Sequence, residues 1–335
     1  MADPGPGPVT AGRGDGAGAR RPGGSEGPGR NSALIGVRAV LLDVDGTLIR
    51  GDAPAEGGHP LPGAAALLRW LRRRDLPYLC FTNGSTRPPE VYARGLRELG
   101  LEVEDDRVMT PPVVAASLIR RRWPGAAVLA LGGEGVTEPL RRRGIAVTTD
   151  PQRWEEAGVV LVGWDREIDY RRLEAACRAV WAGAAFLVTS AAPEFYLRGG
   201  RGIGLSAAIA AAVARVTGRR ARLVGKPSPL ALREACRVLG VAPERLAVVG
   251  DDADMEVRMG RRGAGLSVLV RTGISADRDL ERGPAHLRPD LDLPDLTHLL
   301  ALLEASWALP GDGVPGESPS RARDRGPRGR LGHNE

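Results

Sequence analysis

Acidic, hydroxyl, amide and basic side chains that could do chemistry lie directly after short apolar segments of this 335-residue sequence. These candidates are Asp43, Asp45, Gly46 and Thr47, then Thr82, Asn83 and Gly84, then Lys226, and finally Asp251 and Asp252. Open α/β sheets bind ligands beyond the carboxyl ends of their strands, so residues at such positions can share one site. Converging carboxylates with few cationic partners repel one another unless a cation is bound, and hard oxygen ligands select Mg²⁺.

Asp43 and Asp45 stand two residues apart in the segment DVDGT. Both can face a ligand only if the chain leaves its extended pleat between them, and Gly46 permits that turn. One carboxylate could then attack phosphorus as a covalent nucleophile while its neighbour handles protons. Phosphoryl transfer otherwise needs in-line positioning and charge neutralisation, which hydroxyl and N–H groups, a lysine and Mg²⁺ can supply. Taken alone, the two aspartates could equally form a turn or cap a helix.

Lys226 is the only lysine among the 47 basic residues of the chain. A sequence that otherwise uses arginine, and keeps one lysine beside Pro227, suggests a site that needs a compact point charge. The alternative is a solvated lysine retained by chance.

The elements that would position these residues can be predicted from the hydrophobic pattern. Continuous apolar runs indicate parallel strands covered on both faces at 39–42, 78–81 and 246–249. Helical spacing follows around Leu67 to Leu71, from Pro88 to Leu99 before Gly100, and from Pro229 to Leu239 before Gly240. This alternation predicts a doubly wound, mostly parallel, Rossmann-like α/β sheet.

A middle stretch, residues 112–221, carries its own strand patterns at 127–131, 159–162 and 185–188 and helical patterns at 170–182 and 205–217. Because strand ends of the first kind occur on both sides of it, we expect an α/β domain inserted into the sheet domain. The expected organisation is a disordered Gly/Pro/Arg-rich tail over 1–32, core over 33–111 and 222–305, the insertion between them, and a disordered tail over 306–335.

Composition excludes several classes of protein. The cysteines are three, widely spaced and set in apolar runs, which favours buried free thiols in a reducing compartment and predicts a cytoplasmic protein. No apolar run reaches the roughly 20 residues that span a bilayer, and no secretory signal is visible, so no membrane partner is expected. The net charge of +6 includes no basic stripe interleaved with aromatic residues, so we expect no nucleic-acid partner.

The ordered segments DVDGT, TNGS, GKPSP and GDDADMEV resemble the four motifs of the haloacid dehalogenase (HAD) superfamily. The insertion between the second and third resembles subclass IIA, the NagD-like phosphatases, and the similarity extends over residues 36–305. The resemblance implies a HAD core with an inserted cap and a Mg²⁺-dependent phosphatase. Its substrate would be a small phosphorylated metabolite, such as a sugar phosphate, nucleotide, phosphoglycolate-like compound or aryl phosphate, and the cap could mediate a homodimer.

By this resemblance, Asp43 is the nucleophile and a Mg²⁺ ligand, and Asp45 is the general acid/base and binds the metal through its backbone carbonyl. Asp251 is the third protein ligand of the metal. In the family a second Asp usually follows five residues later, but Glu256 stands there in this chain. Asp252 and Glu256 are therefore candidates for outer-shell support of the metal.

The resemblance also assigns phosphate binding. Thr82, Asn83 and Gly84 would hold the phosphoryl group, and Lys226 would steady both the nucleophile and the phosphate.

The cap departs from the family pattern. Where the family often reads Thr-Asn-Pro-Asp, this chain has Thr189-Ser190-Ala191-Ala192, so the usual polar contacts to substrate are missing. Glu194, Tyr196 and Arg198 are candidate replacements, with an ordinary solvated-loop role as the alternative for each.

Other functions remain open. A HAD-fold phosphate-binding or regulatory protein with little turnover would also account for the altered cap. Hydrolytic dehalogenation needs neither Asp45 nor Asp251, so these residues argue against it. A receiver domain phosphorylated on Asp lacks both the DxDGT turn and a cap.

Overall fold

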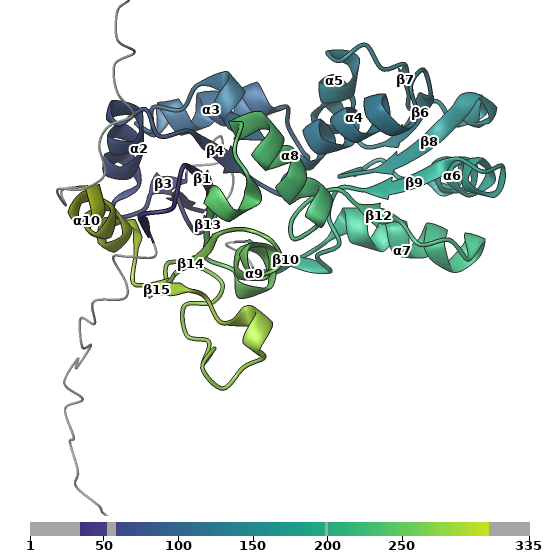
Figure 1. Cartoon of the computed structure of the whole chain (residues 1–335). Helices are drawn as coiled ribbons and strands as arrows, with labels where there is room; N and C mark the ends of the chain where they lie inside the picture. Colours follow the sequence, from purple (N-terminus) through teal and green to yellow (C-terminus); the bar gives the residue numbers. More distant parts are fainter. Residues whose placement is uncertain (1–33, 52–57, 198–199, 308–335) are drawn as a thin grey trace, which may run out of the picture.

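The computed structural model describes residues 34–51, 58–197 and 200–307, without the side chains of 196, 197, 200 and 201. Figure 1 shows two sheets of parallel strands side by side, each covered by helices. The two expected tails lie outside the described residues, apart from residues 306 and 307 at the end of one helix. This architecture confirms the predicted α/β class.

The first sheet has six parallel strands, and its two central strands carry the first and last of the predicted motifs. Its order is β15 (Leu291–Leu293), β14 (Leu266–Val270), β13 (Leu246–Gly250), β1 (Ala39–Leu42), β4 (Tyr78–Phe81) and β5 (Val108–Met109). All four residues of β1 are buried, with Val40 and Leu42 in one core and Ala39 and Leu41 in another. Burial on both faces explains why the strand reads as a continuous apolar run.

Helices cover both faces of this sheet. One core contains α2 (Ala64–Arg73), α3 (Pro89–Glu98) and α10 (Leu296–Trp307), and the other contains α4 (Pro111–Arg122), α8 (Pro229–Leu239) and α9 (Arg258–Arg261). Helix α8 begins where the Ser228 side chain accepts a hydrogen bond from the Ala231 N–H, and it ends at Gly240, whose φ is +68°. These are the expected start and stop signals of a helix.

The second sheet has five parallel strands from the middle of the chain. Its order is β12 (Arg222–Leu223), β9 (Ala185–Val188), β8 (Ala157–Val162), β6 (Ala127–Leu131) and β7 (Val147–Thr148). Helices α6 (Tyr170–Trp181) and α7 (Leu205–Thr217) pack on one face, while α4 and α5 (Glu134–Arg141) pack on the other.

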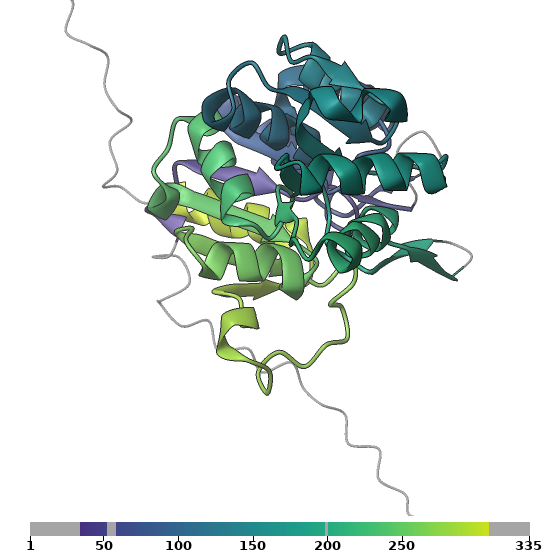
Figure 2. The same ribbon diagram turned by 90° about the vertical axis from the view of Figure 1, so that its right-hand side faces the viewer.

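Two short antiparallel pairs complete the described strands, β2 (Ile49–Arg50) with β3 (His59–Pro60), and β10 (Glu194–Leu197) with β11 (Gly200–Ile203). Figure 2 shows the β10–β11 pair projecting from the body of the molecule. Short helical turns occur at 105–107, 151–156, 243–245 and 285–287, and a π-type turn, η5 (Ala253–Val257), follows β13.

Two expected boundaries need correction. Arg222 and Leu223 were assigned to the core, but β12 pairs in parallel with β9 of the second sheet, so that sheet extends past residue 221. The C-terminal tail was expected from residue 306, but α10 continues to Trp307, whose ring packs edge-on against Trp70 with centroids 5.5 Å apart. The aromatic contact stabilises this last turn.

The three cysteines, Cys80, Cys177 and Cys236, are buried free thiols, as predicted. Among the described residues, no helix has the length and apolar character required to cross a bilayer.

Candidate active site

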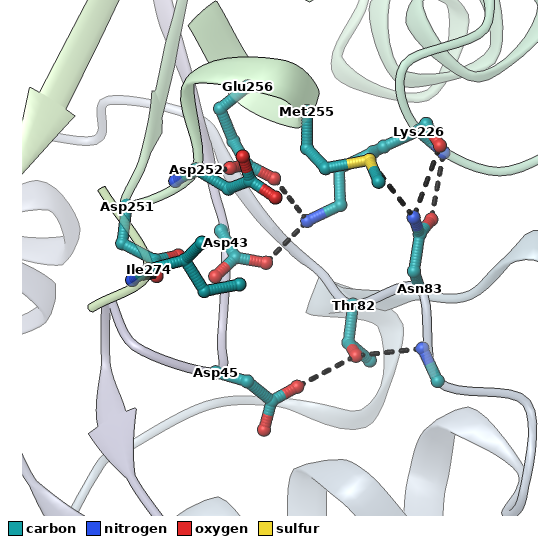
Figure 3. Close-up of polar contacts among 11 residues, drawn as sticks. Asp43, Asp45, Thr82, Asn83, Lys226, Asp251, Asp252, Met255, Glu256 and Ile274 are labelled. Atoms are coloured by element: carbon teal, nitrogen blue, oxygen red, sulfur yellow. Dashed lines mark hydrogen bonds and ion pairs between the residues drawn. The ribbon is translucent and has the colours of Figure 1, made fainter. Parts of the chain in front are cut away.

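Three adjacent strands bring the predicted acidic and hydroxyl residues to one edge of the first sheet. β1 lies between β13 and β4, and because all three run in parallel, their carboxyl ends place Asp43, Asp251 and Thr82 at the same edge. The Asp43 N–H donates to the Val249 carbonyl at 2.9 Å, which continues the ladder to the first catalytic candidate. Figure 3 shows the predicted motif residues converging there.

The turn after β1 depends on Gly46. Its φ is +88°, a conformation that favours glycine. A Cβ atom at this position would lie 2.4 Å from Asp251 Oδ2, so the turn also needs the absence of a side chain. The Gly46 carbonyl accepts a hydrogen bond from Thr272 Oγ1 at 2.6 Å. The turn therefore packs against the chain segments that follow β13 and β14.

Hydrogen bonds after β4 connect the second motif to the first. Thr82 Oγ1 donates to Asp45 Oδ2 at 3.1 Å and accepts from the Gly84 N–H at 2.9 Å. The Asn83 side chain pairs with the Lys226 backbone in both directions, at 2.8 and 3.1 Å. The Asn83 amide therefore positions the lysine, while Thr82 holds the carboxylate of Asp45.

Lys226 lies between two buried carboxylates and is 3% exposed. Its ammonium group contacts Asp43 Oδ1, and it lies 2.7 Å from Glu256 Oε1. Burial alone would lower the pKa of Lys226, but Asp43 and Glu256 raise it above its usual range. Lys226 therefore stays charged and connects the nucleophile candidate to the fourth motif.

The fourth motif is held by backbone hydrogen bonds. Asp251 Oδ2 accepts from the Ile274 N–H at 2.7 Å, and Glu256 Oε2 accepts from the Asp252 N–H at 3.2 Å. Burial, reinforced by Asp43 and Glu256, raises the pKa of Asp251 well above its usual value. Burial raises the pKa of Glu256 to about 8, although Lys226 opposes the shift, and it also raises the pKa of Asp252.

This donor set fits a hard divalent cation. Asp43 Oδ2 is buried and has no hydrogen-bond partner among the described residues, and the carboxyl groups around it outnumber the single ammonium. The described residues contain no group of three or more His, Cys, Asp or Glu side chains arranged to hold a metal. Mg²⁺ commonly binds one or two protein carboxylates and completes its shell with substrate and water oxygens.

Of the three proposed cap contacts, the structure describes the side chain of Glu194 alone. Glu194 begins β10. The Tyr196 side chain and all of Arg198 lie outside the described residues. Ala191 and Ala192 line a cavity beside Lys226.

Ser85 makes a contact between the two sheets that the sequence did not predict. Ser85 Oγ accepts from the Trp164 N–H at 3.2 Å and lies 3.4 Å from Thr189 Oγ1. The Trp164 and Phe195 rings pack edge to face, with centroids 5.1 Å apart. This contact could have been predicted from position in the sequence, because Trp164 and Thr189 follow the ends of β8 and β9 just as Asp43 follows β1.

Gly273 is a second missed residue. A Cβ atom there would lie 1.9 Å from Asp251 Oδ2, so the loop after β14 can approach the carboxylate only with glycine at this position.

Comparison with known protein families gives two matches. Residues 40–146 match the family described as haloacid dehalogenase-like hydrolase, and residues 223–299 match one described as HAD-hydrolase-like. An acid sugar phosphatase of Staphylococcus aureus is 30% identical over 268 residues, which cover 80% of this chain and 98% of the relative.

Solved structures agree with this match. A 4-nitrophenylphosphatase from Thermotoga maritima has a TM-score of 0.72 at 29% identity, covering 81% of this chain and 99% of its own. NagD from E. coli K-12 has a TM-score of 0.68 at 26% identity, covering 78% and 97%.

Proposed function

Because this chain belongs to the haloacid dehalogenase-like hydrolases, among the phosphatases of subclass IIA, we propose that it hydrolyses small phosphomonoester metabolites through an aspartyl-phosphate on Asp43, with Mg²⁺ as cofactor. The observation that carries the proposal is the buried pair of Asp43 and Lys226. Lys226 holds Oδ1 of Asp43, while Oδ2 has no hydrogen-bond partner among the described residues. Lys226 thereby orients Oδ1 for attack on phosphorus, and Oδ2 is left to bind the cation.

In the first step, Asp43 Oδ1 forms a bond to phosphorus as the bond between phosphorus and the ester oxygen breaks. Asp45, oriented by its 3.1 Å hydrogen bond from Thr82, donates a proton to the departing oxygen. In the second step, Asp45 takes a proton from water as the water oxygen attacks phosphorus. The bond to Asp43 breaks, inorganic phosphate leaves, and both carboxyl groups return to their starting states.

The phosphoryl oxygens would be bound by Lys226, the Thr82 hydroxyl and N–H groups of the loop 82–84. These groups neutralise charge that spreads over the equatorial oxygens during transfer. The Asn83 side chain contributes by fixing the Lys226 backbone.

Asp43, Asp251 and the backbone carbonyl of Asp45 would hold Mg²⁺, with Asp252 and Glu256 as outer support. The bound ion would supply positive charge to the phosphoryl group and to the crowded carboxylates. The raised pKa of Asp251, caused by burial and then by neighbouring Asp43 and Glu256, supports this assignment. Without a cation, these carboxylates destabilise one another.

Replacing Asp43 tests the function. The Asp43→Asn variant keeps the size of the side chain but removes the nucleophile, so turnover of 4-nitrophenyl phosphate with Mg²⁺ should fall by at least about 1,000-fold. Circular dichroism of both proteins checks that the fold is retained. A variant that cleaves the ester at the parental rate would rule out the assignment.

The apolar cap loop at Ala191 and Ala192 favours a second candidate, a phosphate-binding or regulatory protein with little turnover. Isothermal titration with phosphorylated metabolites distinguishes the two functions, because the second predicts binding by the unmodified protein without phosphate release.

A further inference from the structure

A cavity of about 790 Å³ lies beside the catalytic cluster. Lys226 and Met255 line it, and both also contact the second motif, since Asn83 binds the Lys226 backbone and Met255 Sδ. The cap loop Ala191–Pro193 and the start of α8 form other parts of its wall. Its volume lies in the range of roughly 300–1,000 Å³ that is usual for small-molecule sites.

Arginine dominates the charge of this cavity. Arg222, Arg233, Arg258 and Arg262 line it, against a single acidic residue, Asp254. They come from three separate parts of the fold, because Arg222 lies in β12, Arg233 in α8 and the other two at α9. The arginines therefore reach the cavity from several elements, and Arg222, Arg233 and Arg262 are exposed.

The acidic residue does not neutralise this charge. Asp254 is shared between Arg258, at 2.7 Å, and Arg278, at 2.5 Å. Within the described parts of the chain, Arg222, Arg233 and Arg262 have no ion-pair partner. The charge of Lys226 is already balanced by Asp43 and Glu256. Three arginines thus remain to bind an anion.

The small cap residues keep this volume open. Ala191 and Ala192 add no charge and little bulk to the wall. A carboxylate at either position would add negative charge to the same cavity wall, so its absence leaves the arginines available to a ligand.

We propose that this cavity binds a second anionic group on the leaving portion of the substrate. The preferred substrate class is then a phosphomonoester that carries another phosphate or a carboxylate. Arg233 and Arg262 determine this specificity, and Arg222 assists from the second sheet. The inference rests on the proposed phosphatase function and refines its substrate class.

Pairs of substrates that differ in one anionic group test the proposal. 3-Phosphoglycerate is compared with glycerol 3-phosphate for a carboxylate, and glucose 1,6-bisphosphate with glucose 6-phosphate for a phosphate. In the substrate pair that shows the larger difference, kcat/KM should be at least about tenfold higher for the substrate with two anionic groups. The two arms identify which anion the cavity accepts.

The Arg233→Gln/Arg262→Gln double variant should reduce that ratio by about tenfold. Arg219→Gln, an exposed arginine that does not line the cavity, is the matched control and should leave the ratio unchanged. Ala192→Asp should also lower the ratio, whereas Ala192→Asn, which differs only in charge, should lower it less.

Ratios near one in the unmodified protein for both arms would overturn the inference, as would a double variant that keeps the parental ratio. If the unmodified protein cleaves neither these esters nor 4-nitrophenyl phosphate with Mg²⁺, the proposed function fails and this inference fails with it.

Discussion

Four buried or half-buried carboxyl groups, from Asp43, Asp251, Asp252 and Glu256, share one edge of the first sheet with the single ammonium of Lys226. Burial raises the pKa of Asp251, Asp252 and Glu256, so each of these groups resists ionisation while no further cation is present. Such clusters of perturbed carboxyl groups are typical of functional sites.

At residue scale, Gly46 gives a sharp prediction. Gly46→Ala places a Cβ atom 2.4 Å from Asp251 Oδ2, and the position already has a φ of +88°. The free energy of unfolding should fall by about 2 kcal/mol or more. Because Asp251 must move, phosphatase activity should fall by at least about 100-fold. Urea denaturation and initial-rate assays measure the two effects.

Gly100→Ala is the matched control. Its φ is +80°, but a Cβ there meets nothing within 4 Å, so it shows the backbone penalty alone, about 1–2 kcal/mol, with activity retained. Equal activity losses in the two variants would contradict the role given to the contact with Asp251.

Some residues of the site could be predicted from their positions in the sequence, and others could not. Asp43, Thr82 and Asp251 could be predicted because each follows an apolar run, and Lys226 because it is the only lysine. The contact of Glu256 with Lys226 depends on the turn of η5, which brings a side chain five residues from Asp251 back over the site. No sequence spacing specifies such a side-chain direction.

At element scale, strands buried on both faces were the most predictable parts of the fold. The bounds of β1, β4, β6 and β9 agree with the apolar runs of the sequence. β12 has two residues and one is exposed, so its pattern carries too little information, and its sheet is determined by pairing with β9. The β10–β11 hairpin was not predicted, since its glycine-rich second strand gives no apolar alternation.

The contact between α4 and α8 yields an element-scale prediction. Glu234 on α8 is 1% exposed and accepts hydrogen bonds from Arg237, at 2.6 Å, and from Arg121 of α4, at 3.1 Å. Burial alone would raise the pKa of Glu234, but hydrogen bonds from Arg237, Ser117 and Arg121 lower it below its usual value. Glu234→Gln should therefore lower the free energy of unfolding at pH 7 by about 1–2 kcal/mol.

The sign of the pH dependence follows from the lowered pKa. The stabilisation by ionised Glu234 is present above its unfolded pKa of about 4.3 and is lost as pH falls through the lower folded value. Urea denaturation from pH 7 to pH 3 should show the two proteins converging in stability. Glu174→Gln, which breaks an exposed pair with Arg178, is the control and should change stability by less than about 0.5 kcal/mol. A gap for Glu234→Gln that stays constant with pH would refute the charge-based explanation.

At the scale of the whole molecule, the two sheets meet through close backbone approaches. A Cβ atom on Gly135 would lie 2.4 Å from the Arg87 nitrogen, and one on Gly225 would lie 2.6 Å from Asn83 Oδ1, which follows β4. The insertion could be predicted because strand ends of the same kind occur on both sides of it. The contacts between the sheets could not be predicted, because they join residues far apart in the chain. The division into core over 33–111 and 222–305 and cap over 112–221 stays a prediction, with β12 as the stated exception.

Cation binding should stabilise the whole molecule, because the site joins chain segments on both sides of the insertion. Adding millimolar Mg²⁺ should raise the midpoint of thermal unfolding, since a ligand that binds only the folded state stabilises it. Removal by EDTA should reverse the shift and abolish phosphatase activity. The Asp251→Asn variant should show a much smaller shift, and an equal shift in both proteins would place the ion elsewhere.

The central claim, that Asp43 carries the phosphoryl group during turnover, is tested most directly by trapping that intermediate. The protein is mixed with 4-nitrophenyl phosphate and Mg²⁺, quenched in acid within milliseconds, digested and examined by mass spectrometry. The account predicts a phosphorylated peptide containing Asp43 that forms before phosphate release and decays with turnover. Rapid phosphate release with no label on Asp43 at any time, or with the label on another residue, would contradict it.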